Sequence, residues 1–426
     1  MPQEHTIERA VLVGLNADCF SKEETASEAS LEELEALLET AGGLCTAKIL
    51  QNRHTPDART LIGAGKAEEI RQLIQATEAG MAIFDNPLSP SQIRVLEELL
   101  GVTVLDRSAL ILDIFAQRAK TAEGRLQVEL AQYKYLLPRL SGMGISLSRQ
   151  GGGIGTRGPG ETQLETDRRH IHRKIDKLKE ELEEVRRVRN TQRQRRMKNE
   201  IPVVAIVGYT NAGKSTLLNA ITGAGIPANN RLFDTLDTTT RLLTVSDTLD
   251  VVISDTVGFI RKLPHQLVEA FKATLEELEY ADLLLHVIDL SNPQWAQQAQ
   301  VVDDLIRELK ADHIPCLRVY NKCDLAFSGA LPREKDSVYI SAKTGEGIKR
   351  LLQAVDEKLD KGTRRVTIHL PYDKAGLLDG LYREAKVENV EYGETVDVTA
   401  VCTPRIMGQL KDYIEGWQEE KEDWEQ

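Results

Sequence analysis

A phosphate-binding loop is predicted near the middle of the chain. Gly208-Tyr-Thr-Asn-Ala-Gly213-Lys214-Ser215 fits the pattern GxxxxGK[ST] between an apolar run and a helical stretch. Glycines let backbone N–H groups curl around a phosphate, and the helix N-terminus adds partial positive charge. The complete match in this context disfavours the alternative, a glycine-rich turn with an incidental lysine. The residues predicted to bind nucleotide here are Gly208, Tyr209, Thr210, Asn211, Ala212, Gly213, Lys214, Ser215 and Thr216.

Side chains that could hold a metal and contact the γ-phosphate follow from the loop. Lys214 is predicted to reach the β- and γ-phosphates, and the Ser215 hydroxyl to bind Mg²⁺. Asp255-Thr256-Val257-Gly258 comes directly after an apolar run. Asp255 is expected to hold Mg²⁺ through water, and the Gly258 N–H to contact the γ-phosphate. A DxxG sequence alone is weak, so its weight comes from its place behind a phosphate loop.

A base-recognition sequence follows the predicted strand Leu317–Tyr320. In Asn321-Lys322-Cys323-Asp324, the Asp324 carboxylate can accept two hydrogen bonds from guanine that adenine cannot offer. Lys322 is expected along the base plane, and Asn321 is expected to brace the phosphate loop. Ser341, Ala342 and Lys343 end the next strand and are expected to contact the guanine oxygen. In order behind a phosphate loop, these residues predict GTP rather than ATP.

The residues that complete the reaction are less determined. Thr235 is predicted to complete the Mg²⁺ shell in a switch loop, with Thr239 as the alternative and a plain threonine-rich loop as competitor. Phe259 stands where Ras-like enzymes carry a water-positioning glutamine, so intrinsic hydrolysis is expected to be slow without help. Asn211 could ligate a monovalent cation such as K⁺, or only brace the loop. The predicted catalytic residues are Lys214, Thr235 and Gly258.

Strands that alternate with helices are predicted to position these motifs. They indicate an α/β chain with a P-loop GTPase domain (a doubly wound sheet), an N-terminal α/β domain, a helical-hairpin linker and a small C-terminal α+β domain. The expected boundaries are 1–115, 116–200 (the hairpin), 201–362 (the GTPase domain) and 363–426. In the GTPase domain the predicted helices are Lys214–Thr222, Gln266–Leu278, Ala296–Lys310 and Gly347–Leu359.

The predicted hairpin has apolar residues at nearly heptad spacing on both arms. Leu126, Leu130, Tyr133 and Leu137 mark the first arm, and a stripe from Ile171 to Val188 marks the second. The stretch between them, 141–160, is rich in glycine. We expect two long helices that face each other and are joined by a glycine-rich tip. This hairpin is expected to project rather than to pack as a globule.

Bulk composition excludes several classes of protein. The chain has 426 residues, 41% of them hydrophobic, and a net charge of −12, so it has no overall basic character. No run approaches the ~18 apolar residues that cross a bilayer, and the N-terminus lacks a signal-peptide core. Five scattered cysteines indicate neither a disulfide framework nor a zinc site. A cytoplasmic monomer is the simplest expectation.

Motifs outside the nucleotide loops resemble those of the HflX family of the translation-factor-like GTPases. The sequence from Gly151 to Arg169 resembles that family's linker signature, Phe233-Asp-Thr-Leu-Asp and Asp255–Pro264 resemble its switches, and Leu110–Arg118 also matches. The resemblance covers about residues 10 to 360. One departure is Thr238, which stands where the family usually has proline. Because proline fixes φ, its replacement by threonine could loosen the switch backbone.

The resemblance implies a GTPase that binds the large ribosomal subunit and splits or rescues ribosomes. It also implies that the hairpin and the N-terminal domain face ribosomal RNA. A basic run is consistent with phosphate contacts, although a solvated helix face is the alternative. Other functions remain open: large-subunit assembly, RNA modification, or a GTP-regulated protein scaffold. The predicted RNA-binding residues are Arg149, Arg157, Arg186, Arg187, Arg189, Arg193, Arg195, Arg196 and Lys198.

One further motif lies in the N-terminal domain. Gly63-Ala-Gly65-Lys66 precedes a helix and resembles a shortened phosphate loop. A second nucleotide site there is one interpretation. Because the full spacing is missing, a loop-to-helix turn is the favoured one.

Overall fold

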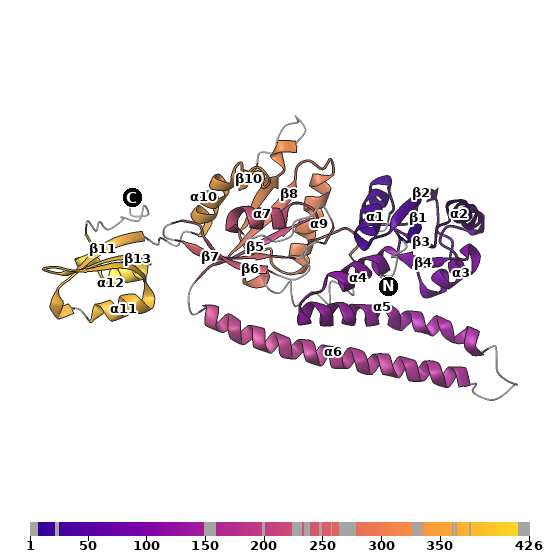
Figure 1. Cartoon of the computed structure of the whole chain (residues 1–426), viewed down its shortest axis with the longest axis horizontal. Helices are drawn as coiled ribbons and strands as arrows, with labels where there is room; N and C mark the ends of the chain where they lie inside the picture. Colours follow the sequence, from indigo (N-terminus) through magenta and orange to yellow (C-terminus); the bar gives the residue numbers. More distant parts are fainter. Residues whose placement is uncertain are drawn as a thin grey trace, which may run out of the picture.

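Three globular domains and a long helical hairpin make up the chain (Figure 1). The structure is a computed structural model. It describes residues 7–21, 25–148, 159–197, 201–223, 232–233, 239–246, 249–256, 258–263, 278–325, 334, 336–359, 362, 364–374 and 376–415. No helix within these ranges is both long and apolar enough to cross a membrane.

The N-terminal domain is a four-stranded parallel sheet with helices on both faces. Its order is β2-β1-β3-β4, and alternate residues of β1 point to opposite faces. Ala10 and Leu12 pack against α1 and α4, whereas Val11 and Val13 pack against α2 and α3. The elements are β1 (Arg9–Ala17), α1 (Glu28–Ala41), β2 (Leu44–Arg53), α2 (Ala64–Thr77), β3 (Met81–Phe84), α3 (Pro90–Leu100), β4 (Thr103–Asp106) and α4 (Arg107–Arg118).

The hairpin consists of α5 (Ala122–Ser148) and α6 (Pro159–Met197), which lie side by side in Figure 1. The two apolar stripes face each other as predicted, since Leu130 packs with Ile175, Leu178 and Leu182. In addition, α5 packs on the N-terminal domain, which the sequence analysis did not predict. The Tyr135 hydroxyl donates to Asp106 at 2.8 Å, and helix α5 packs along α4.

The GTPase domain is a six-stranded sheet in the order β10-β9-β8-β5-β7-β6, parallel except for β6. Helix α7 spans the predicted residues, Lys214–Thr222. The predicted helix Gln266–Leu278 lies outside the described residues except for Leu278, which begins a 3₁₀ turn. The remaining elements are β5 (Val203–Gly208), β6 (Thr239–Thr244), β7 (Asp250–Asp255), β8 (Leu283–Asp289), α9 (Trp295–Glu308), β9 (Cys316–Asn321), β10 (Ser337–Tyr339) and α10 (Ile348–Leu359).

The C-terminal domain is a three-stranded antiparallel sheet, β11-β13-β12, with two short helices. Its order along the chain, strand, helix, strand, strand, helix, agrees with the sequence pattern. The elements are β11 (Arg364–Leu370), α11 (Leu377–Glu384), β12 (Lys386–Tyr392), β13 (Val396–Cys402) and α12 (Pro404–Gln409). Together they enclose a separate hydrophobic core. The α/β class with an N-terminal, a GTPase and a C-terminal domain is therefore confirmed.

Candidate nucleotide site

The predicted nucleotide motifs meet at one edge of the GTPase sheet. Strands β7, β5, β8 and β9 are parallel neighbours, so their carboxyl ends lie at the same edge. The phosphate loop follows β5, Asp255 ends β7, and Asn321 ends β9. Ligands of open α/β sheets bind at this edge, beyond the carboxyl ends of the strands.

The phosphate loop is held in shape by close backbone contacts. A Cβ atom at Gly208 would collide with the Val287 carbonyl, and one at Gly213 would collide with the Asn321 amide. Gly213 also has φ of 94°, a conformation that favours glycine. Both glycines are therefore required by the packing of this loop.

Lys214 is buried beneath the loop that precedes it. Its Nζ donates to the Gly208 carbonyl at 3.2 Å and to the Tyr209 carbonyl at 2.9 Å. Burial lowers the pKa of Lys214 to about 8, although the nearby Asp255 carboxylate opposes this shift. The folded loop thus carries an ammonium group with little solvent around it, a strong electrostatic partner for a phosphate.

Two of the predicted metal ligands already touch. The Ser215 hydroxyl donates to an Asp255 carboxylate oxygen at 3.0 Å, and Asp255 is fully buried. A hydroxyl and a carboxylate are hard oxygen donors, which suit Mg²⁺. Thr235 and Val257 lie outside the described residues. Thr239, the alternative switch threonine, pairs with Asp255 in the antiparallel register of β6 and β7.

The predicted base-binding residues are joined through Asn321. Its amide donates to the Ala212 carbonyl at 2.8 Å, and its oxygen accepts from the Ala342 N–H at 3.0 Å. Asn321 thereby connects the phosphate loop with the segment Ser341–Lys343. Lys322 donates to Asp289 at 2.6 Å, and Asp324 is exposed just beyond β9. The arrangement leaves a carboxylate facing solvent beside a braced loop, as guanine recognition requires.

Phe259 and Asn211 differ in their surroundings. The Phe259 side chain is 3% exposed and belongs to the core shared with the N-terminal domain. Its ring is therefore a packing group, which agrees with the expectation that it cannot orient water. Asn211 is exposed on the loop at φ of 62°, a left-handed conformation that asparagine adopts more readily than most residues.

Sequence reasoning missed Asp289 at this edge, and it missed the partners of two residues that it had named, Tyr209 and Phe233. Asp289 ends β8 and holds Lys322. The Tyr209 hydroxyl donates to Glu33 of the N-terminal domain at 2.5 Å, and the Phe233 ring packs on Phe115 with centroids 4.6 Å apart. A carboxylate at a strand end signals Asp289, whereas no local pattern reports the contacts between domains.

The predicted RNA-binding residues are only partly described. Arg186 and Arg187 are exposed on α6, and Arg187 lies 3.5 Å from Glu184. Helix α6 also carries Arg189, Arg193, Arg195 and Arg196, whose side chains are outside the described part. Arg149, Arg157 and Lys198 lie outside the described residues altogether. In the shortened loop, Gly63 caps α2 and Lys66 pairs with Glu69, as a loop-to-helix turn requires.

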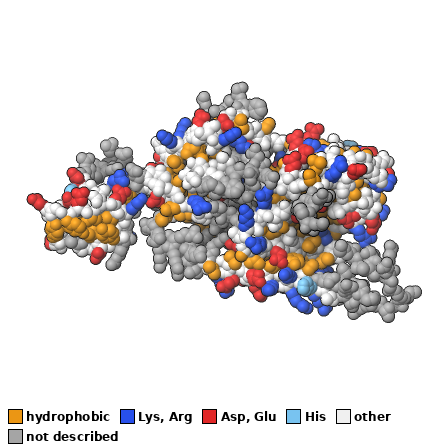
Figure 2. Space-filling model, viewed as in Figure 1, with side chains coloured by type: hydrophobic (Ala, Val, Ile, Leu, Met, Phe, Trp, Pro, Cys, Tyr) orange, Lys and Arg blue, Asp and Glu red, His pale blue; other side chains and the backbone are white. Residues whose placement is uncertain are grey.

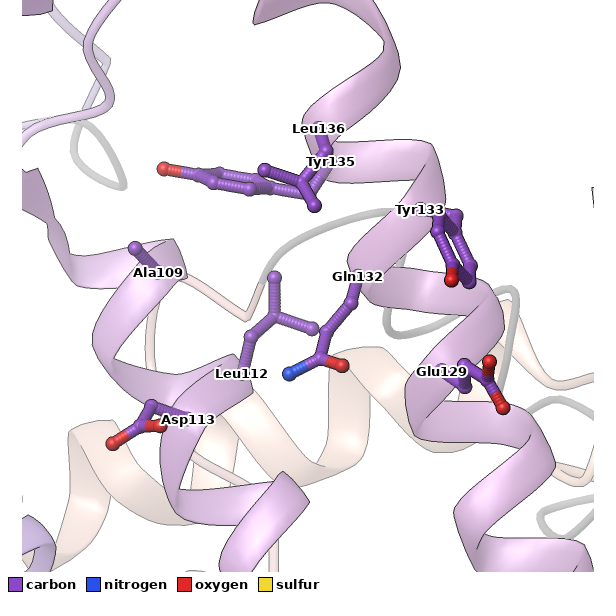
Figure 3. A pocket seen from close by; sticks show the side chains of 8 residues that line it. All are labelled: Ala109, Leu112, Asp113, Glu129, Gln132, Tyr133, Tyr135 and Leu136. Carbon is purple, nitrogen blue, oxygen red and sulfur yellow. The ribbon is translucent and has the colours of Figure 1, made fainter. Parts of the chain in front are cut away.

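A pocket of about 580 Å³ lies elsewhere, between α4 and α5 (Figure 3). None of the predicted nucleotide-binding residues lines it, although Leu112 and Asp113 belong to the motif Leu110–Arg118, so the pocket is separate from the nucleotide site. In Figure 3 Leu112 and Gln132 face each other across its floor. The lining residues are Ala109, Leu112, Asp113, Glu129, Gln132, Tyr133, Tyr135 and Leu136.

Family comparisons cover nearly the whole chain. Residues 28–116 match the family "GTP-binding GTPase N-terminal", and 118–196 match "GTP-binding GTPase Middle Region". Residues 203–322 match "50S ribosome-binding GTPase", and 330–424 match "HflX C-terminal domain". The GTPase HflX of Caldanaerobacter subterraneus subsp. tengcongensis is 49% identical over 408 residues, 96% of this chain and 94% of that protein. The chain belongs to the HflX GTPase family.

Two further proteins are similar to this chain. The GTPase HflX of Escherichia coli K12 is 45% identical, covering 89% of this chain and 90% of that protein. A similar solved structure is a GTP-binding protein from Sulfolobus solfataricus in complex with GDP, 26% identical, with 83% of this chain and 98% of that chain covered and a TM-score of 0.45. This HflX-family chain is a GTPase, it binds guanine nucleotides, and its GTPase domain is of the ribosome-binding type.

Proposed function

We propose that this HflX-family GTPase binds the large ribosomal subunit with GTP, splits or rescues ribosomes, and is released after hydrolysis. One observation carries the proposal. The residues that match the 50S ribosome-binding GTPase family, 203–322, are those whose strand ends bring the phosphate loop, Asp255 and Asn321 to one edge. A nucleotide at that edge touches the switch segments, so its γ-phosphate can control the surface offered to a partner.

At the phosphate end, the loop residues bind through their backbone. The N–H groups of 209–213 surround the β-phosphate, and Lys214 moves its ammonium toward the β- and γ-phosphates. Ser215 and Asp255 hold Mg²⁺, which when bound neutralises charge on the phosphates. The Gly258 N–H donates to the γ-phosphate, and Thr235 completes the metal shell, with Thr239 as the alternative.

At the base end, Asp324 selects guanine. Its carboxylate accepts from N1–H and from the exocyclic amine, while Lys322, held by Asp289, lies along the base plane. Asn321 joins this end to the phosphate loop through its 2.8 Å bond to Ala212. The two ends of one nucleotide are therefore held by a single connected set of residues.

Hydrolysis needs a group that Phe259 does not supply. In this proposal the side-chain carbonyl of Asn211, which is exposed on the loop, would hold K⁺, and the ion would supply positive charge to the phosphates. A positive charge there offsets the charge that develops during phosphoryl transfer. The ribosome supplies the remaining stimulation.

The RNA-facing surface is assigned to α6 and the tip of the hairpin. Arg186, Arg187, Arg189, Arg193, Arg195 and Arg196 lie within the last turns of α6, and Arg149, Arg157 and Lys198 flank the two helices in sequence. Clustered cations bind phosphate groups with strong dependence on salt. The chain acts as a monomer, since one copy carries every group invoked.

Sedimentation of the full chain with purified ribosomes tests the proposal. The wild-type chain is expected to migrate with large subunits in a non-hydrolysable GTP analogue, and to be lost from them in GDP and at high salt. The matched variant is Asp324→Asn, whose amide complements xanthine rather than guanine. It should lose co-migration with the GTP analogue and regain it with the corresponding xanthosine nucleotide.

Each outcome separates the alternatives. Migration only at the top of the gradient under all conditions would reject ribosome binding and favour a protein scaffold. Co-migration restricted to immature large subunits would favour a role in assembly. If Asp324→Asn bound the GTP analogue as well as the wild-type chain, the assignment of the base site would be wrong.

A further inference from the structure

Described residues of both predicted switch regions contact the N-terminal domain. The Phe233 ring, just before the switch I threonines, is buried against Phe115 of α4, and the Leu232 N–H donates to Thr40 of α1 at 3.3 Å. Arg261 and Lys262 follow Phe259, and their side chains reach acidic groups of the N-terminal domain. Both segments that must respond to the γ-phosphate are therefore attached to the same neighbouring domain.

The acidic groups form a buried cluster around Arg107. Arg107 is 2% exposed and contacts both Glu33 and Asp85, with Nη1 2.8 Å from Asp85. Lys262 pairs with the other oxygen of Asp85. Burial alone would raise the pKa of Asp85, but the neighbouring Arg107 and Lys262 hold that pKa below its usual value. The cluster is thus a fixed, charged anchor for the segment after Phe259.

Tyr209 connects this anchor with the phosphate loop. Its hydroxyl donates to Glu33 at 2.5 Å and accepts from the Arg261 N–H at 2.9 Å. Its own backbone carbonyl accepts from Lys214 at 2.9 Å. One phenol therefore touches the N-terminal domain and switch II, while its backbone belongs to the loop that surrounds the phosphates.

In this arrangement switch II lies directly on the phosphate loop. The Thr210 N–H donates to the Phe259 carbonyl at 2.7 Å, and the Phe259 N–H donates to the Gly208 carbonyl at 3.1 Å. A Cβ atom on Gly258 would lie 2.9 Å from the Lys214 Nζ, so the Gly258 backbone packs on that ammonium group. Lys262 adopts φ of 55°, a left-handed conformation that costs energy in a residue other than glycine.

We propose that Tyr209 is a positioning residue for switch II, through which Glu33 of the N-terminal domain holds that segment against the phosphate loop in opposition to binding of the γ-phosphate. The inference rests on the nucleotide site proposed above. Gly258 must move away from the Lys214 ammonium before a γ-phosphate can lie between them. GDP carries no γ-phosphate and makes no such demand. Any contact that favours the packed arrangement therefore lowers affinity for GTP relative to GDP.

The test compares two nucleotides on the same folded chain. Tyr209→Phe removes the hydroxyl and keeps the ring in its core. The affinity of the full chain for a non-hydrolysable GTP analogue, divided by its affinity for GDP, should rise about tenfold, because a hydrogen bond to a charged group is lost from the packed arrangement only. GDP affinity should change by less than about twofold.

The matched control is Tyr135→Phe. It removes a buried hydroxyl that also donates to a carboxylate, Asp106, but this bond joins helix α5 of the hairpin to the end of β4 in the N-terminal domain and does not involve the GTPase domain. Its affinity ratio should equal that of the wild-type chain. A purely structural role of Tyr209 would lower both affinities together and leave the ratio unchanged, and that result would overturn the proposal, as would a fall in the ratio.

A second pair of variants tests the ion pairs that attach switch II to the N-terminal domain. Lys262→Ala should raise the ratio in the same direction as Tyr209→Phe. Lys386→Ala, which removes a lysine from an ion pair with Asp250 at the other domain junction, should not. An Asp324→Asn chain that still binds GTP normally would overturn the site itself. If Asp324→Asn weakened GTP binding as expected but Lys262→Ala left the ratio of GTP-analogue to GDP affinity unchanged, only the role of the N-terminal domain would be overturned.

Discussion

The GTPase domain has two junctions, and they differ in how they are built. At the N-terminal junction Phe115 and Phe233 lie in one hydrophobic core that runs through both domains, and Arg107 lies buried within the charged cluster beside it. At the C-terminal junction Lys386, 52% exposed, pairs with Asp250. The C-terminal domain keeps a separate core.

The difference indicates which domain senses the nucleotide. A buried, packed junction transmits a movement of the switches, because a close-packed core does not deform gradually. An exposed ion pair transmits little. Figure 2 shows hydrophobic side chains gathered on the C-terminal domain, where Tyr372, Tyr382 and Tyr392 are exposed. The C-terminal domain therefore contributes an exposed hydrophobic surface. The N-terminal domain, by contrast, contacts the switch residues and takes part in the proposed switch.

The largest effect is expected from the buried arginine at the N-terminal junction. Arg107→Met leaves the buried carboxylates of Glu33 and Asp85 without their main partner, which should cost about 3–5 kcal/mol of unfolding free energy. Urea titration of the full chain measures this. Arg94→Met, which removes an exposed pair with Glu98, should cost less than about 0.5 kcal/mol. Equal losses in the two variants would mean that the junction is not the more strongly held region.

A smaller loss of unfolding free energy, together with a change in nucleotide affinity, is expected at the contact between Phe115 and Phe233. Phe115→Leu should cost about 1–2 kcal/mol and also change the ratio of GTP-analogue to GDP affinity several-fold, because Phe233 loses its ring partner. Phe84→Leu is the control. Phe84 is equally buried, but it lies in the core on the opposite face of the N-terminal sheet, away from α4. It should lose similar stability and keep the wild-type ratio. A changed ratio in both variants would trace the effect to general loosening.

Local patterns predicted the elements and motifs within each domain and missed the contacts between domains. The helix Lys214–Thr222 and the two apolar stripes of the hairpin were predictable, because their periodicity and flanking residues are contained in short windows of sequence. The strand ends were predictable for the same reason, so the motifs could be assigned to one edge of a parallel sheet before the structure was known.

The partners of Tyr209 and Phe233 could not be predicted. Glu33 lies in an ordinary amphipathic helix, 176 residues before Tyr209, and its charge is no different from that of its exposed neighbours. The phenol was read as one more residue of a phosphate loop, and Phe233 as part of a switch signature. Their contacts depend on how two domains dock, which no local periodicity encodes. The packing of α5 on α4 was missed for the same reason.

The smallest change in unfolding free energy is expected from a substitution at the C-terminal junction. Lys386→Ala should lower the unfolding free energy by less than about 1 kcal/mol, because both partners are partly solvated. The loss should shrink further in high salt. Calorimetric unfolding of the full chain, with Lys66→Ala as an exposed-pair control, measures it.

The acidity of Asp250 gives this last prediction a second check. The hydrogen bond from Lys386 is the main cause that lowers the pKa of Asp250 below 3.8, and Thr244 adds a second hydrogen bond. A carboxyl group with a lowered pKa stabilises the fold above pH 3.8 and loses that contribution as the pH falls through its folded value. The difference between Lys386→Ala and wild type should therefore be present at neutral pH and fade in acid. A difference of several kcal/mol at neutral pH would instead mean that the C-terminal domain is docked as firmly as the N-terminal one, and the contrast between the two junctions would not hold.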